Sequence, residues 1–362
     1  MKKLYQFASV LFLLFICFSC NKPATEKTES TDLAEAEEQQ LAAGRQPQVS
    51  VDPAGIVRIV YGHENKIYCA TSSDQGKSFS KPQLVGQIDG LYLGMAMGPQ
   101  IASSANFSKV TAIDKKGNIH SFSLEHNTAE WVKIAAVNDV AGVAPEGLMT
   151  LDAAGNDRFY ATWLDVRNDK QNKIVFASTT GKDTTWSDNK IIYISPDKTV
   201  CECCKPSMDV KGNNLVIMFR NWVNGSRDFY FTTSADGGAT FSEPVKLGKG
   251  TWKLEGCPMD GGGILIDAKN KFHTVWQRDG HIFYAQPDSK EVEIGKGRNV
   301  RISGTQNPVI SWKDGKELKV KLLASEQAVT VGTGSYIETA VLADTSILSV
   351  WENEGAIFYK KI

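Results

Sequence analysis

The feature that most restricts the fold of this chain is a repeated strand–turn–strand hairpin. Two short apolar segments joined by a turn recur at intervals of about fifty residues. The seven copies are Ile56–Val60 with Lys66–Ala70, Lys109–Ile113 with Asn118–Phe122, Phe159–Trp163 with Ile174–Ser178, Leu215–Phe219 with Phe229–Thr233, Phe272–Trp276 with His281–Ala285, Val309–Trp312 with Leu318–Leu322, and Ile347–Trp351 with Ala356–Tyr359. Four-stranded sheets repeated radially close into a ring without exposed edges, so the repeat predicts an all-β propeller. The last two hairpins are closely spaced, which leaves six and seven blades open.

Two turns carry a sharper motif. Ser72–Phe79 and Ser234–Phe241 both match Ser-x-Asp-x-Gly-x-x-aromatic, the Asp box, and a weaker copy runs from Ser178 to Trp186. The Asp accepts backbone N–H bonds across the turn, the Gly takes a positive φ, and the aromatic ring fills the gap beside it. We expect these turns to stabilise the fold rather than to bind a ligand.

The Asp boxes also orient the ring. In propellers of this kind they join the third and fourth strands of a blade, so the connections between second and third strands, and between successive blades, lie on the opposite face. Loops on a rigid scaffold are the usual place for function, so we expect the site on that face. Its loops hold Arg167, Arg220, Arg227, Cys201 to Cys204, Cys257 and Tyr336.

The N-terminus has the pattern of a lipoprotein export signal. Lys2 and Lys3 precede an apolar run from Val10 to Phe18, which ends at Ser19-Cys20. The run is too short for a lasting membrane span, and the small residue before Cys20 fits the cleavage site of lipoproteins. We expect a signal peptide over 1–20 with Cys20 as the lipidation site, a disordered tether over 21–44, and the propeller over 45–362. The protein would then be anchored by lipid to the cell envelope, at the outer membrane; plain secretion and an uncleaved anchor are the alternatives.

The charge of the chain makes one class of partner, nucleic acid, unexpected. The chain has 362 residues and a formal net charge of −1, with its cations spread along the sequence. A nucleic-acid-binding surface needs a basic patch, so nucleic acid is not an expected partner. We expect a monomer that contacts the membrane only through its lipid.

Several segments after residue 45 resemble the sialidase (neuraminidase) superfamily, the exo-sialidases with Asp-box repeats. Arg45-Gln46-Pro47 stands where that family has the first arginine of a carboxylate-binding triad. Glu202, then Arg220 and Arg227 before the second Asp box, resemble the family's glutamate and second arginine, and Arg301 lies where a third arginine is expected. Bidentate guanidinium contacts suit an anionic sugar, so the resemblance implies a glycan or glycoconjugate as partner.

The resemblance also implies a mechanism. Ser335-Tyr336 is similar to the segment around the family's tyrosine nucleophile, so Tyr336 would form the covalent intermediate with Glu202 as its base. The family's acid is an aspartate on a long loop of the first blade, whereas here this loop is only Gly62–Asn65. Glu64 is the candidate acid. Each of these residues also has a structural interpretation, and Glu64 and Arg167 are more simply interpreted as solvated loop charges.

The cysteines depart from the sialidase pattern. Cys201, Cys203 and Cys204 fall within four residues, and Cys257 lies on the equivalent loop of the next blade. In an exported protein the expected arrangement is a disulfide from Cys203 or Cys204 to Cys257. The alternative is copper or zinc held by the thiolates, and otherwise no cofactor is expected. With Cys69, five cysteines follow Cys20, so at least one of them has no partner within the chain.

Three functions remain open from the sequence. The first is a sialidase-like glycoside hydrolase that releases terminal sialic acid from glycans. The second is a propeller that binds a glycan or a protein on the same face without catalysis, which the short acid loop favours. The third is a metal-handling lipoprotein that uses the cysteine cluster.

Overall fold

The computed structural model describes residues 37–362, which form seven four-stranded antiparallel sheets. The predicted signal peptide, Cys20 and the tether up to residue 36 lie outside the described residues. Within 37–362, no helix has the length and apolar character needed to cross a membrane.

Six sheets are built from four consecutive strands each. They are β2 (Arg45–Val51), β3 (Val57–His63), β4 (Lys66–Ser72) and β5 (Gln83–Gln87); β6 (Gln100–Ser103), β7 (Phe107–Ile113), β8 (Ile119–Glu125) and β9 (Trp131–Ile134); β10 (Met149–Ala154), β11 (Arg158–Asp165), β12 (Lys173–Thr180) and β13 (Lys190–Tyr193); β14 (Ser207–Lys211), β15 (Asn214–Arg220), β16 (Phe229–Ser234) and β17 (Val245–Lys246); β18 (Gly263–Ile266), β19 (Phe272–Arg278), β20 (His281–Ala285) and β21 (Val292–Lys296); and β22 (Arg298–Ser303), β23 (Val309–Asp314), β24 (Glu317–Leu322) and β25 (Val329–Thr333). The seventh sheet joins β26 (Ser335–Val341), β27 (Ile347–Asn353) and β28 (Ala356–Lys361) to β1 (Gln39–Ala43).

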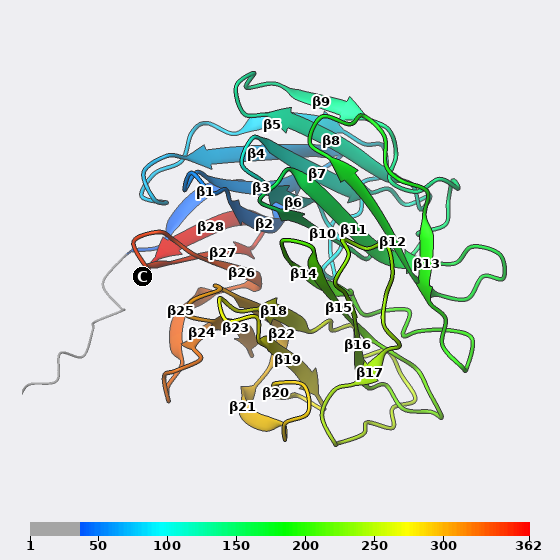
Figure 1. Cartoon of the computed structure of the whole chain (residues 1–362). Coiled ribbons are helices and arrows are strands. Elements are labelled where there is room, and N and C mark those ends of the chain that lie inside the picture. The colour runs from blue at the N-terminus through cyan, green and yellow to red at the C-terminus, as the bar shows by residue number, and fades with distance from the viewer. Residues whose placement is uncertain (1–36) are drawn as a thin grey trace, which may run out of the picture. The chain divides into compact units, whose positions relative to one another are not determined.

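The seven sheets are the blades of a propeller, and we number them 1 to 7 in chain order, from β2–β5 to the sheet of β26–β28 and β1. The first strand of each blade contacts the first strand of the next, from β2 through β6, β10, β14, β18 and β22 to β26, and β26 contacts β2 again. Figure 1 shows these innermost strands around the centre of the ring. The two closely spaced hairpins at the C-terminus belong to separate sheets, β23–β24 and β27–β28, so the number of blades is seven rather than six.

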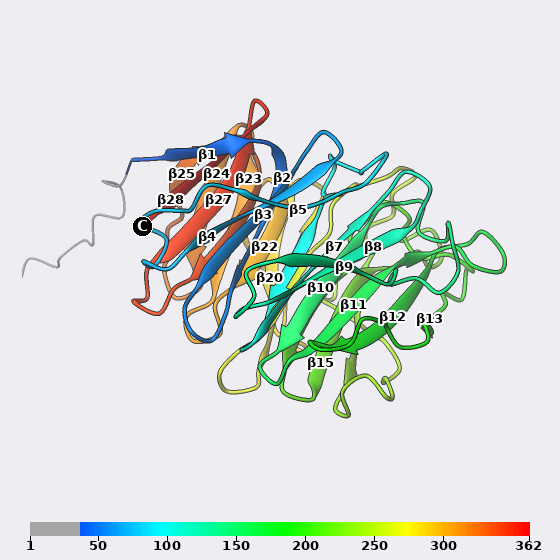
Figure 2. The same ribbon diagram turned by 90° about the horizontal axis from the view of Figure 1, so that it is seen from above.

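Strand β1 closes the ring and corrects one sequence boundary. It pairs antiparallel with β28, from Gln39 opposite Tyr359 to Ala43 opposite Ala356, and lies beside it in Figures 1 and 2. The Tyr359 hydroxyl also donates a hydrogen bond to Gln39 Oε1 (2.6 Å). Residues 39–43 therefore belong to the propeller, not to the tether predicted over 21–44. A five-residue edge strand is too short to show a clear hydrophobic periodicity, so only its pairing with the end of the chain identifies it.

The hydrophobic core lies between neighbouring blades. Central strands such as β7 and β15 are buried on both faces, which explains their nearly continuous apolar sequences. Four blades place a buried tryptophan near the end of the second strand: Trp163, Trp276, Trp312 and Trp351. The rings of Trp312 and Trp351 pack on glycines of the preceding blade's outer strand, where a Cβ would come within 2.9 Å and 2.6 Å of them.

The Asp boxes have the predicted location and geometry. They lie between β4 and β5 and between β16 and β17. In the first box, Asp74 Oδ1 accepts from the Ser78 N–H (3.0 Å) and Oδ2 from the Ser78 hydroxyl (2.6 Å). The equivalent bonds of Asp236 with Thr240 are 2.9 Å and 2.6 Å. These bonds from the neighbouring hydroxyl and N–H groups hold the pKa of both carboxyls well below the usual range.

Candidate functional site

We call the end of the propeller where the innermost strands begin the upper face. Alternation of strand direction places the connections between second and third strands, and those between blades, at this end, and the Asp boxes at the other. The sequence prediction of the two faces is therefore confirmed. All the candidate residues described below come from connections or strand ends of the upper face, except Arg301 in the channel.

A cleft on the upper face consists of two cavities that share Met95. One cavity, of about 450 Å³, includes Arg45, Glu64, Tyr92 and Lys115 in its lining. The other, of about 410 Å³, is lined by Met95, Met259, Gly297, Arg298, Asn299, Lys313, Gly315 and Tyr336. Each volume falls in the range of pockets that bind small ligands. We refer to the two cavities together as the upper-face cleft.

The cleft is cationic. Arg45, Lys115, Arg298 and Lys313 line it, and Glu64 is the only carboxylate among its lining residues. The Arg45 side chain is 54% exposed, and its only ion pair among residues 37–362 is a 3.4 Å contact with Glu352. Arg298 Nη2 donates to the Pro258 carbonyl (2.6 Å), so most of the donors of both guanidinium groups remain free for an anionic ligand.

Tyr336 lines the cleft and contacts a bend in the β5–β6 connection. This connection reaches the last blade, where the Met95 N–H donates to the Tyr336 hydroxyl oxygen (2.9 Å). Gly94 and Met97 bridge the bend, and Met95 and Ala96 both have positive φ. Tyr336 also has a positive φ, of 54°, at the start of β26, an uncommon backbone conformation for a residue other than glycine.

Glu202 lies in a different cluster. Its Oε2 accepts from Arg227 Nη1 (3.3 Å), and the same Nη1 donates to Cys201 Sγ (3.0 Å). The Arg227 guanidinium stacks on Trp222, with 4.0 Å from Cζ to the ring centroid. No hydrogen bond joins Glu202 to Tyr336 within the described residues, so the nucleophile–base pair that the resemblance implies is not assembled in this conformation.

Arg220 is buried beneath that cluster and is only 2% exposed. Its Nη1 donates to the Arg227 carbonyl (2.8 Å) and its Nη2 to the carbonyls of Gln277 (2.8 Å) and Asp260 (3.3 Å). Its Nε has no partner among the described residues. Because its forked donors are already bonded to the backbone, a sugar carboxylate has no access to them in this conformation.

The cysteines of the upper face form one cluster. Cys203 is bonded to Cys257, one of the two disulfide pairings predicted, while Cys201 and Cys204 are buried free thiols, as is Cys69 in β4. Cys201 Sγ lies 3.4 Å from Cys204 Sγ and 3.8 Å from Cys203 Sγ. The hydrogen bond between the two thiols, aided by Arg220 and Arg227, lowers the pKa of the Cys201 thiol, whereas burial raises that of Cys204.

Arg301 lies in the central channel instead of the cleft. Its Nε donates to Glu338 Oε1 (3.2 Å), which also accepts from Gln48 (2.8 Å). The channel encloses a cavity of about 440 Å³ that includes these residues, Lys205 and Asp209 in its lining. Burial lowers the pKa of Lys205 to about 7 and raises that of Asp209 to about 7. The three predicted triad arginines thus occupy three separate environments.

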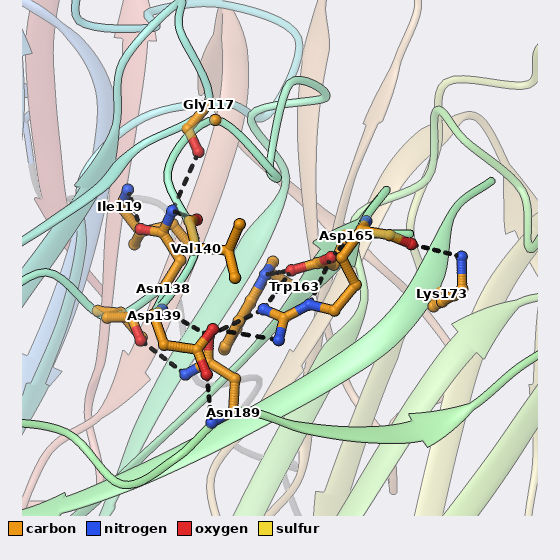
Figure 3. A network of polar contacts seen from close by, with 12 residues as sticks. Gly117, Ile119, Asn138, Asp139, Val140, Trp163, Asp165, Lys173 and Asn189 are labelled. Atoms are coloured by element: carbon orange, nitrogen blue, oxygen red, sulfur yellow. Dashed lines mark hydrogen bonds and ion pairs between the residues drawn. The ribbon is translucent and has the colours of Figure 1, made fainter. Parts of the chain in front are cut away.

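Arg167, interpreted from the sequence as a solvated loop charge, is mostly buried in an ion-pair network. Its Nε and Nη2 both bond to Asp165 (2.9 Å each), and Nη1 pairs with Asp139 (3.1 Å). Asp139 and Asn189 exchange backbone-to-side-chain bonds beside Asn138 (Figure 3). The partner Asp165 ends β11 two residues earlier, but the carboxylate of Asp139 comes from a different blade connection, which the sequence does not reveal. This network joins the β9–β10 connection to blade 3, a structural role.

The cleft brings together Arg45, Glu64 and Tyr336, three residues that the sequence analysis singled out, but with different neighbours from those expected. Met95, Arg298 and Lys313 were not among the predicted site residues. The only signal for them in the sequence was their position in connections or at strand ends that the repeat and the Asp boxes assign to the upper face.

No protein-family model matches the sequence, and no curated protein matches it. Solved structures do resemble the fold. An ulvan lyase of a polysaccharide lyase family, bound to -[GlcA(1-4)Rha3S]-, is 11% identical, with 90% of this chain and 96% of that chain covered and a TM-score of 0.56.

Two further neighbours also act on or bind sugars. The SapL1 lectin in complex with alpha methyl fucoside is 11% identical, with 81% of this chain and 97% of that chain covered and a TM-score of 0.51. An alpha-L-arabinofuranosidase from Fusarium graminearum, in complex with an iminosugar inhibitor, is 11% identical, with 89% and 93% covered and a TM-score of 0.50. At this identity the comparisons establish the propeller fold, which hosts many functions.

Proposed function

We propose that this propeller binds an acidic glycan in the upper-face cleft. The observation that carries the proposal is the composition of the cleft: four cationic side chains, one carboxylate and two tyrosines line two adjoining cavities. Guanidinium groups bind carboxylate and sulfate through paired hydrogen bonds, and tyrosine rings offer flat apolar surface for a sugar ring. The glycan ligands of the similar propellers support the same class of partner.

The sialidase version of this proposal is more specific. Tyr336 lines the cleft and would act as the nucleophile, with Glu202 as base and Glu64 as acid, as the resemblance implies. Glu202 is bonded to Arg227 and not to Tyr336, so this mechanism needs a rearrangement of the loop before β14. We therefore propose binding as the primary function and hydrolysis of a sialoside as the second candidate, favoured by the position of Tyr336.

The proposed location follows from the N-terminal signal. Lipidation at Cys20 would hold the propeller at the cell envelope, where polysaccharides and glycoconjugates are accessible. The upper-face cleft would then act as a capture site for soluble or neighbouring glycans.

The test is a set of calorimetric titrations of the full-length protein with sialyllactose, a uronate- and sulfate-containing ulvan oligosaccharide, and neutral lactose. Two cations, Arg298 and Lys313, are replaced with glutamine in one variant. The matched control replaces Lys182 and Lys269, exposed cations outside the cleft, and so carries the same change in net charge. Loss of two charge-assisted contacts of about 1.5 kcal/mol or more each predicts an affinity about 100-fold weaker in the cleft variant.

The control variant should bind like the wild type. Preference for an acidic over the neutral ligand, lost only in the cleft variant, supports the proposal. Equal binding of acidic and neutral ligands, or equal loss in both variants, refutes it. Incubation with a fluorogenic sialoside distinguishes hydrolysis: release of the fluorophore that is abolished in Tyr336→Phe supports the second candidate, and its absence from a folded protein that binds glycan rules that candidate out.

A further inference from the structure

The cysteine cluster is not used by the proposed glycan site. The sulfur atoms of Cys201, Cys203 and Cys204 lie within 4.8 Å of one another, and Cys257 is bonded to Cys203, so four sulfurs from two loops meet in one place. The loops precede β14 and β18, the first strands of neighbouring blades. A single disulfide needs only two of these residues, which leaves two buried thiols beside it without a structural explanation.

The sulfur positions match the geometry of a thiolate-bound metal. In a tetrahedral site with metal–sulfur bonds of about 2.3 Å, neighbouring sulfurs are about 3.8 Å apart. Cys201 Sγ lies 3.8 Å from Cys203 Sγ and 3.4 Å from Cys204 Sγ. Three corners of such a site are therefore in place, and reduction of the Cys203–Cys257 bond would free the fourth.

The surrounding charge favours an anionic centre. Arg220 is 2% exposed, bonds only to backbone carbonyls and has a buried Nε without a partner among the described residues. The side chain of Arg227 is 3% exposed. It forms an ion pair with the partly exposed carboxylate of Glu202 and donates a hydrogen bond to Cys201 Sγ (3.0 Å). The buried Asp260 carboxylate also interacts with Arg220, but Arg298 and Arg301 share it, so the two buried guanidinium groups are only partly compensated, which is costly. Four thiolates around a divalent cation carry two excess negative charges, which the two guanidinium groups would balance.

We propose that Cys201, Cys203, Cys204 and Cys257 form a site for a soft d10 metal ion, Zn²⁺ or Cu⁺, that is available only when the Cys203–Cys257 disulfide is reduced. A dithiol reductant supplies two electrons and two protons to this disulfide and becomes a disulfide itself. The four thiols then release their protons to solvent as the ion binds. Soft thiolate ligands select these ions over Mg²⁺ or Ca²⁺, and Arg227 acts as a positioning residue through its bond to Cys201.

The first experiment compares two forms of the full-length protein. One sample keeps the disulfide and the other is reduced with a phosphine and handled without oxygen. Each is titrated with Zn²⁺ against a chromophoric chelator, and in a parallel arm with Cu⁺ against a copper-specific chelator. We expect about one ion per reduced chain and an affinity at least tenfold lower for the oxidised protein. Cobalt(II) bound by the reduced protein should show thiolate-to-metal charge-transfer bands and the strong d–d bands of tetrahedral geometry.

Variants then assign the ligands. Cys201→Ser and Cys204→Ser should each lose the cobalt bands and weaken metal binding at least tenfold, whereas Cys69→Ser, which removes a buried free thiol of blade 1, should match the wild type. Arg227→Gln, which retains all four ligands, should weaken binding roughly 10- to 100-fold.

One measurement needs no variant and so remains informative where a serine substitution prevents folding. In the reduced wild type, bound Zn²⁺ should slow alkylation of Cys257, an exposed residue, at least tenfold. The proposal is overturned where the reduced protein binds no ion more tightly than the oxidised protein. Binding by folded Cys201→Ser and Cys204→Ser that equals binding by Cys69→Ser also overturns it. Preference for one metal in the two arms identifies the ion.

Discussion

Replacing Arg167 with methionine tests how strongly the Figure 3 network holds blade 3 to its neighbour. Arg167 is 10% exposed and Asp165 is fully buried, with two parallel bonds of 2.9 Å between them. The substitution leaves Asp165 with the Trp163 indole N–H (2.8 Å) and the backbone N–H of residue 167 (2.8 Å), but with no cation on its carboxylate. Breaking a buried pair on one side typically costs about 3–5 kcal/mol.

Differential scanning calorimetry measures the effect. An unfolding entropy near 2.1 cal/mol/K per residue gives about 0.7 kcal/mol/K for a propeller of roughly 330 residues, so a cost of 3–5 kcal/mol predicts a fall in Tm of about 4–7 °C. The control Lys182→Met removes an exposed cation at the other end of β12 and should leave the Tm unchanged. Adding Asp165→Asn to Arg167→Met removes the unpaired charge, so the double variant should be less destabilised than the sum of the single changes.

A Tm for Arg167→Met within about 1 °C of the wild type would refute this reasoning, because a shift that small corresponds to less than about 1 kcal/mol. Simple additivity in the double variant would contradict it as well. Either result would mean that the buried pair contributes little net stability, because the cost of desolvating its charges offsets their attraction.

Two further predictions concern turns and the channel. In urea unfolding, Gly238→Ala should lower the free energy of unfolding by about 1–3 kcal/mol more than Gly76→Ala. Both glycines have positive φ, but a Cβ at residue 238 would lie 2.4 Å from the Phe176 ring, whereas a Cβ at residue 76 would lie 3.3 Å from its nearest atom, in Leu348. Equal losses in the two variants would contradict the packing argument. Burial raises the pKa of Asp209 to about 7, so the folded state binds a proton that the unfolded state releases, and stability falls as pH rises from about 4 toward 7. Asp209→Asn should therefore raise the Tm more at pH 8 than at pH 5, and an equal effect at the two pH values would exclude this titration.

The sequence predicted which loops form the upper face, but it predicted few of the contacts that their side chains make there. The connections before β6, β14 and β18 were assigned to it from the repeat and the Asp boxes, and the pairing of Cys203 with Cys257 was one of two stated options. Arg220 and Arg227 were expected to face a ligand, but their donors bond to backbone carbonyls, Glu202 and Cys201. A guanidinium has the same sequence signature whether it binds a ligand or a buried carbonyl.

By itself, the sequence determined the blade repeat, the Asp boxes and therefore the two faces, because hairpin periodicity and turn chemistry are local properties of the chain. Tertiary structure decided the number of blades, the closure by β1, and which loops meet at the cleft. The bond between Met95 and Tyr336 spans 241 residues, and that between Gln39 and Tyr359 spans 320. Contacts at such separations depend on how many blades close the ring and at what angle, which is a property of packing between sheets and leaves no pattern in neighbouring residues.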